Sequence, residues 1–389
     1  MTEPSTEEET GITTLSSTPT LPIREFTGQP SDTLTYEFDP NADITLVLRN
    51  APQNLPPSLQ GLNRSDLAGS LPVFSTNSSI FRRGKTLRLR VSSRHLTLSC
   101  PYFARMLESQ FREGTEFQST GQAEIELQET RTMSFLLLMF IIHCRTRQVP
   151  TAVTLSVLTD IAVLVDYYEC HDAIALFANL WIKDLAYTVP KPITAPIGVT
   201  AFQPDCNDSA LNWLLISWVF KDKSVFKQVT SHLLHYSIDE ISSDGLPIPG
   251  SIIERLNSQR NANISFLIND LNALHSQAAK GCQKQAVKSV QMCTYTVLGA
   301  LTKHMMDMKL HPTSPASPYK GIGITELKQI CAAWTSPEIT EPYLPNHHAA
   351  CSLKSRVAAV LKRHPDLVGL ELDDTFGKSV RGRGKETVN

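Results

Sequence analysis

One group of cysteines and histidines in the C-terminal half could bind a transition metal: Cys282, Cys293, His347, His348 and Cys351. Thiolates and imidazoles are the usual ligands of tetrahedral zinc. His347 and His348 lie four and three residues before Cys351, so a helical turn can bring one histidine and Cys351 to the same ion. Cys282 and Cys293 lie near the two ends of a segment that can fold back. One hypothesis is therefore a zinc site of Cys282, Cys293, His348 and Cys351.

The simpler interpretation of these residues needs no ion. Ten residues separate Cys282 from Cys293, which is not a usual gap between zinc ligands, and Cys293 lies in an apolar helical stretch. The chain has eight cysteines, no CxxC pair and no secretory signal, which is typical of reduced thiols. Buried cysteines and an exposed histidine pair then explain the same pattern. On this interpretation we expect no metal and no cofactor.

The other motifs that could carry chemistry are incomplete. Gly321-Ile-Gly323 lacks the third glycine of a dinucleotide loop and follows no strand, so we expect a loop that enters a helix with Thr325 as its N-cap. His232 and His235 are three residues apart on a predicted helix, but no HExxH motif accompanies them. GxSxG, HRD and DFG motifs are absent from the sequence. We expect no catalytic residues and no enzymatic activity.

Composition limits the classes of partner. The chain has 389 residues with 41% hydrophobic content and a net charge of −2, so it can form about two or three domains. Near-neutral charge argues against nucleic acid and against a membrane surface. The apolar run 133–144 is too short for a bilayer, which needs ~20 residues. Without a signal peptide, a cytoplasmic or nuclear location is expected.

Hydrophobic periodicity predicts an α+β fold. Alternating apolar residues indicate strands at 44–49 and 86–91, and a shorter strand at 124–128. Between the last two strands we expect a helix with Ser99 as N-cap, Pro101 in its first turn and Gly114 as its stop. Helices are predicted at 130–144, 155–168 and 173–185, and at 284–308, 324–334 and 350–363 in the C-terminal half.

These elements suggest five segments. We expect a disordered tail at 1–35, a small sheet with a helical cluster at 36–188, a Pro-rich linker at 189–209, a helical domain at 210–373 and a basic flexible tail at 374–389. The α+β segment is interrupted by a long loop insertion at 50–83.

The stretch Leu89-Arg-Val-Ser-Ser-Arg-His-Leu-Thr-Leu-Ser-Cys-Pro-Tyr-Phe-Ala-Arg-Met-Leu107 resembles the signature of BTB/POZ domains. In that family a strand and a helical turn precede a helix of the type Ser-x-Tyr-Phe-x-x-Leu, and here Cys100 replaces the serine. The family's aspartate at the start of its first strand is matched by Asp43, and its later acidic strand by 124–128. The resemblance covers roughly residues 36–188. The stretches 213–220, 246–249 and 318–321 are similar to the C-terminal region of fungal BTB-domain proteins, which has no assigned activity.

This resemblance implies a non-enzymatic scaffold or adaptor that binds other proteins, with a cullin-type ubiquitin ligase as one such partner. The working surface would be formed by the helices at 94–111 and 131–145. The interaction residues would be Asp43, Arg94, Tyr102, Phe103, Arg105 and Met106. The competing hypothesis is a nuclear regulator of transcription or chromatin that uses the basic residues at 381–385.

One departure from the family concerns assembly. Dimerising animal BTB domains carry a His-basic pair just after the second strand, where this chain has Ser92 and Ser93. Asp43 would then lack a basic partner, so we expect it to be solvated or bonded differently. The segment before Asp43 is also poor in helix signals. We therefore expect no homodimer of the strand-swapped type.

Overall fold

The computed structural model describes residues 33–69, 84–108, 110–128, 131–191, 206–282, 290–337 and 351–372. The strands are β1 (Thr33–Glu37), β2 (Ile44–Ala51), β3 (Lys85–Val91) and β4 (Ala123–Leu127). The helices packed around them are α1 (Arg64–Ala68), α2 (Ser93–Ser99), α3 (Pro101–Met106), α4 (Arg112–Thr120), α5 (Thr132–Ile142), α6 (Leu155–Tyr168) and α7 (His171–Asp184). The remaining helices are α8 (Cys206–Val219), α9 (Lys223–Tyr236), α10 (Gly250–Ala279), α11 (Val290–Asp307), α12 (Ile324–Ala332) and α13 (Leu353–Arg363).

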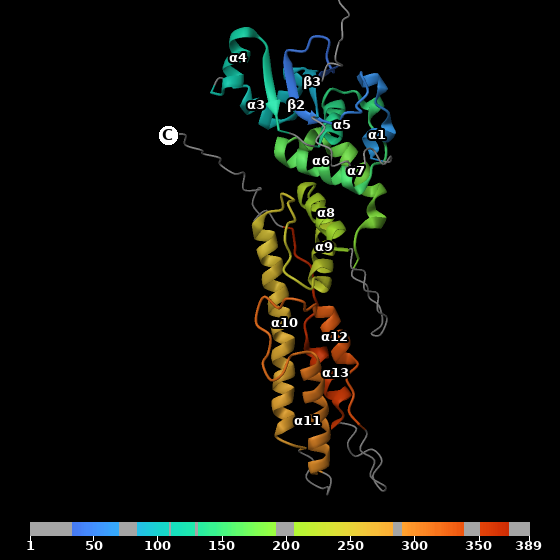
Figure 1. Ribbon diagram of the computed structural model, residues 1–389, viewed down its shortest axis with the longest axis vertical. Helices are drawn as coiled ribbons and strands as arrows, with labels where there is room; N and C mark the ends of the chain where they lie inside the picture. The colour runs from blue at the N-terminus through green and yellow to red at the C-terminus, as the bar shows by residue number, and fades with distance from the viewer. Residues whose placement is uncertain are drawn as a thin grey trace, which may run out of the picture.

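The predicted α+β fold class is confirmed, and the molecule is elongated (Figure 1). The sheet and helices α1–α7 form one end. Helices α8 and α9 follow below them, and α11–α13 form the opposite end. The long helix α10 runs beside α9 and then beside the last three helices, so it connects the middle of the molecule to its far end.

The four strands form one mixed sheet in the order β1-β3-β2-β4. β2 pairs antiparallel with β3, while β1 and β4 pair in parallel with β3 and β2 respectively. Leu46 lies opposite Leu89 on one side and Ile125 on the other, and all three side chains are buried. The opposite face carries arginine–glutamate pairs, including Arg90 with Glu37 at 3.0 Å. Because these pairs are exposed, each stabilises the sheet little.

Helix α5 is buried on every side, because the described residues from Ser134 to Ile142 all lie in the core. This position explains the apolar run at 133–144 without a membrane. No helix in the described part of the chain is long and apolar enough to span a bilayer.

The buried side chains form two cores that meet along α10. The first runs from the sheet through α8 and α9 and reaches Leu256. The second begins at Ile264 and continues through α11, α12 and α13. Neither core contains the residues between Leu256 and Ile264, so this short part of α10 joins two separately packed bodies.

Arg260 lies in this junction and is only 1% exposed. Its guanidinium donates hydrogen bonds to carbonyl oxygens of two irregular segments that precede α10 and α12. The acceptors are Ser237 at 3.1 Å, Ile238 at 2.6 Å, Pro318 at 2.8 Å, Tyr319 at 3.1 Å and Ile322 at 2.9 Å. Irregular backbone that is buried needs such donors, because it has no helix or sheet to satisfy it. The arginine therefore fixes both segments against α10.

Several sequence expectations are corrected in detail. Three residues of the expected disordered tail belong to β1, and residues 1–32 lie outside the described part. The first part of the expected loop insertion 50–83 folds onto the core through Leu55, Leu62 and α1, and residues 70–83 lie outside the description. Most of the expected linker 189–209, at 192–205, and the tail from 373 onward also lie outside it.

Helix boundaries near the motif also differ from the expectation. Cys100, and not Ser99, is the N-cap of α3, because Ser99 ends the preceding helix α2. Gly114 does not stop a helix but lies within α4, where a Cβ atom would meet the Glu108 carbonyl oxygen at 1.8 Å. Gly114 is required by this close approach of two backbone segments. Farther along the chain, Gly323 replaces Thr325 as the N-cap of α12.

We predict that Arg260→Met lowers the free energy of unfolding by about 3–5 kcal/mol, because several buried carbonyl groups lose their donor. Methionine keeps much of the buried side-chain length, so loss of packing contributes little. Urea denaturation of the full chain measures the change. Arg255→Met on an exposed position of the same helix is the control, with an expected change below about 0.5 kcal/mol. A loss of less than about 1 kcal/mol at Arg260 would contradict this role.

Candidate functional site

The turn between β3 and α2 carries the motif that resembles BTB/POZ domains. Asp43, at the start of the neighbouring strand, accepts hydrogen bonds from the Ser93 backbone N–H at 2.7 Å and from the Ser93 hydroxyl at 2.6 Å. The expectation that Asp43 is bonded differently is confirmed. Its carboxylate lies at the first residue of α2, where the helix dipole favours a negative charge. Asp43 thus supports the turn between β3 and α2.

His143 supports the same turn from α5. Its Nε2 accepts a hydrogen bond from the Ser92 backbone N–H at 3.2 Å, and its Nδ1 lies 3.0 Å from the Met139 carbonyl oxygen. An accepting Nε2 and a donating Nδ1 define a neutral imidazole with its proton on Nδ1. Burial lowers the pKa of His143 to about 4, which agrees with this neutral form.

A surface pocket of about 530 Å³ lies between α3, the end of β4 and α6. Most of its lining is aromatic or aliphatic, with three polar side chains. The lining residues are Tyr102, Met106, Glu126, Leu127, Gln128, Arg131, Val163, Leu164, Tyr167 and Tyr168. Polar atoms make up more of its exposed lining than apolar atoms, so the pocket offers hydrogen-bonding groups beside the aromatic rings.

Three tyrosines form one wall of the pocket. The rings of Tyr102, Tyr167 and Tyr168 have centroids 4.9–5.3 Å apart, and the Tyr102 and Tyr167 hydroxyls are 3.2 Å apart. Burial and then the Tyr167 hydroxyl raise the pKa of Tyr102 above its usual range, so its hydroxyl stays protonated. Tyr167 is 53% exposed and is therefore the ring most accessible to a partner.

The remaining predicted interaction residues have different environments. Arg105 is exposed and forms a two-bond ion pair with Glu169, at 2.9 and 3.0 Å, which attaches α3 to the end of α6. Phe103 is fully buried and stacks on Tyr168, so it supports the tyrosine wall from inside. Arg94 is exposed on α2 and is not among the residues that line the pocket. Of the six predicted residues, Tyr102 and Met106 line the pocket.

Sequence reasoning missed Tyr167 and Tyr168. Both end α6, whose predicted bounds 155–168 are those observed. The sequence feature that could have identified them is an aromatic pair at the C-terminal end of an apolar helix. Only the tertiary fold, however, brings this pair to Tyr102.

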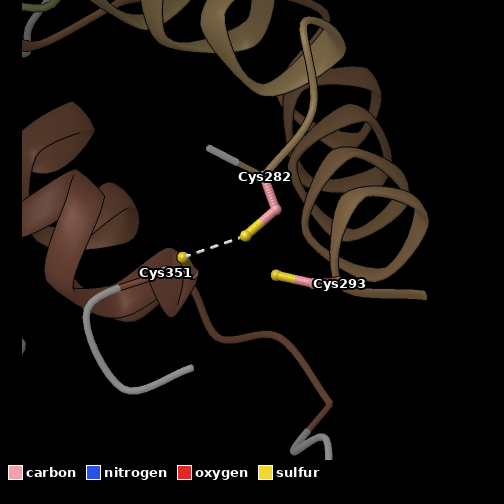
Figure 2. Close-up of side chains that lie close together, drawn as sticks. All are labelled: Cys282, Cys293 and Cys351. Carbon is pink, nitrogen blue, oxygen red and sulfur yellow. Dashed lines mark hydrogen bonds between the residues drawn. The ribbon is translucent and has the colours of Figure 1, made fainter. Parts of the chain in front are cut away.

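At the opposite end of the molecule, three of the four predicted zinc ligands come together (Figure 2). The sulfur atoms of Cys282, Cys293 and Cys351 lie within 4.8 Å of one another, and those of Cys282 and Cys351 are 3.8 Å apart. In the described residues this is the sole group of three or more such side chains whose ligand atoms lie so close together. The fourth predicted ligand, His348, lies outside the described residues.

The remaining candidate residues make structural contacts, although the buried Nε2 of His232 has no hydrogen-bond partner among the described residues. His232 is buried, with its Nδ1 3.3 Å from the Lys191 carbonyl oxygen, and His235 is 3.2 Å from the Thr325 hydroxyl. Gly321 has a φ of 72° in the turn before α12, as a loop glycine does. The basic residues at 381–385 lie outside the described residues.

No protein-family model, curated protein or solved structure matches this chain. The resemblance to BTB/POZ domains therefore rests on the motif around Tyr102 and on the order of the elements.

The environment of His143 predicts a pH dependence of stability. Its pKa is about 4 in the folded chain and 6.5 in the reference state, so between these values the unfolded chain binds a proton that the folded chain does not. Stability is therefore lost as the pH falls from 6.5 to 4, by on the order of 3 kcal/mol from this group. Urea denaturation across this range should give a shallower pH dependence for His143→Gln. An unchanged slope in that variant would refute the assignment.

Proposed function

We propose that the chain is a non-enzymatic interaction protein whose BTB/POZ-like N-terminal half binds a partner protein at the tyrosine-walled pocket between α3, β4 and α6. The observation that carries this proposal is the pocket itself, because it lies at Tyr102 and Met106 in the motif helix. The residues that line the pocket suit a protein partner. Tyrosine and arginine are enriched in the few interface residues that contribute most of the binding free energy.

The chemistry of the lining supports binding over catalysis. Among its lining residues the pocket has no histidine, serine, cysteine or lysine, which are frequent catalytic nucleophiles and bases. Glu126 is paired with Arg49, and Arg131 donates to Asp160 at 3.1 Å. The aliphatic lining residues beside these polar groups are buried or half-buried, namely Leu127, Val163 and Leu164.

The partner would insert an apolar side chain into this pocket and place a polar group near Arg131 or Gln128. The BTB/POZ resemblance suggests an adaptor function, with the scaffold subunit of a cullin-type ubiquitin ligase as the first partner to examine. Within the chain β1 pairs in parallel with β3, so β1 has a pairing partner without a second copy. Regulation of transcription through the basic tail remains the competing proposal, but no described residue favours it.

We predict that Tyr167→Ala weakens partner binding by at least ~10-fold, because it removes the most exposed ring of the wall. Affinity purification of the tagged full chain, followed by mass spectrometry, identifies the partner. Titration calorimetry with that purified partner then measures the affinity of each variant.

Tyr187→Ala is the matched control. Tyr187 is 80% exposed and lies outside the pocket, so its removal should change the affinity less than ~2-fold. An equal loss of affinity in the two variants, or an unchanged affinity of Tyr167→Ala, would show that the partner uses another surface.

A further inference from the structure

Three segments converge on the cysteine cluster of Cys282, Cys293 and Cys351. Cys282 follows the end of α10, after Gly281 turns the chain with a φ of 92°. Cys293 lies near the start of α11, and Cys351 directly precedes Ser352, the N-cap of α13. Figure 2 shows the three side chains directed toward one another. A ligand at this point would join three helices of the second core.

The distances fit a tetrahedral ion. Two Zn–S bonds of ~2.3 Å at a tetrahedral angle place their sulfur atoms about 3.8 Å apart. The Cys282 and Cys351 sulfurs are 3.8 Å apart, and the third sulfur lies within 4.8 Å of both. A disulfide would use two of these sulfurs at ~2.05 Å and leave the third without a partner. The triangular arrangement therefore favours a metal over a disulfide.

The surroundings suit thiolate ligands. Cys293 and Cys351 are buried and Cys282 is half-buried, so the cluster has one accessible side for an entering ion. Cys351 lies at the N-terminal end of α13, where the helix dipole favours a negative charge. Without a cation, burial and the neighbouring Cys282 thiol raise the pKa of Cys293 to about 12. A bound divalent cation has the opposite effect on the thiol pKa, because it stabilises the thiolate form.

Two hydrogen bonds fix the backbone near the cysteines. The backbone N–H of Cys282 donates to the Thr294 hydroxyl at 3.0 Å, and Thr294 directly follows Cys293. The Ser352 hydroxyl accepts from the Ser355 backbone N–H at 3.3 Å and so fixes the start of α13 beside Cys351. These hydrogen bonds fix the backbone at Cys282 and beside Cys351.

We propose that Cys282, Cys293 and Cys351 bind one zinc ion that ties the end of α10 to the starts of α11 and α13. Zinc fits better than magnesium or calcium, which prefer oxygen ligands. Each thiol releases its proton when it binds, and the fourth tetrahedral position is left to a ligand other than these three. The site strengthens the second core and is independent of the partner pocket at the other end of the molecule.

The test measures metal content and stability of the full chain, purified under reducing conditions and then given equimolar zinc and desalted. We expect about one zinc ion per chain by elemental mass spectrometry in the native protein. The variants Cys282→Ser and Cys293→Ser should each bind zinc more than ~100-fold more weakly and retain less than about a tenth of it. Cys282→Ser is the milder change, because its side chain is only half-buried.

Cys331→Ser is the matched control. Cys331 is a buried thiol of the same core but is outside the cluster, so this variant should keep its zinc. A strong zinc chelator should lower the melting temperature of the native chain and of Cys331→Ser, and leave that of Cys282→Ser unchanged. Cobalt in place of zinc should give sulfur-to-metal charge-transfer absorption that both cluster variants lose.

Three outcomes would overturn the proposal. They are a native chain that retains no zinc, cluster variants that retain as much zinc as the native chain, or a disulfide between Cys282 and Cys351 in the freshly purified chain.

Discussion

The Arg260 guanidinium is the contact on which the arrangement of the two cores depends. It lies on α10 between Leu256, which belongs to the first core, and Ile264, which belongs to the second. Its hydrogen bonds hold the segment before α10 and the segment before α12 against the same point of one helix. Buried carbonyl groups must be satisfied wherever the backbone is irregular, and one side chain with five donors can satisfy several at once. The sheet end and the far helices also meet where α9 packs against α12, and Arg260 is the buried charged side chain at this junction.

Local patterns predicted much of the fold, because periodicity depends only on neighbouring residues. The alternation of Ile44, Leu46 and Leu48 gave β2, and the spacing of apolar residues gave α6 with its observed bounds. β1 was missed because it is short and pairs in parallel with β3, a partner about fifty residues away. Gly114 was taken as a helix end, since nothing in the sequence shows that the backbone of Glu108 would approach it.

The two candidate sites were predictable by residue type but not by geometry. The motif identified Tyr102 and Met106, whereas Tyr167 joins them only because α6 packs against α3. The cysteines were considered as zinc ligands beside the simpler expectation of no metal, and their irregular spacing gave no evidence that three segments bring the sulfurs together. Arg260 gave no sequence signal at all. An arginine on a helix is usually solvated, and its burial follows from the tertiary fold alone.

The protein is elongated, with the tyrosine-walled pocket at its sheet end and the cluster of three cysteines at the other. We propose that a partner binds at this pocket, and site-specific photocrosslinking in cells tests the proposal most directly. A photoreactive phenylalanine analogue in place of Tyr167 should crosslink one partner protein, while the same analogue in place of Tyr187 should not. Crosslinking of that same partner at position 187 and not at 167 would contradict the account.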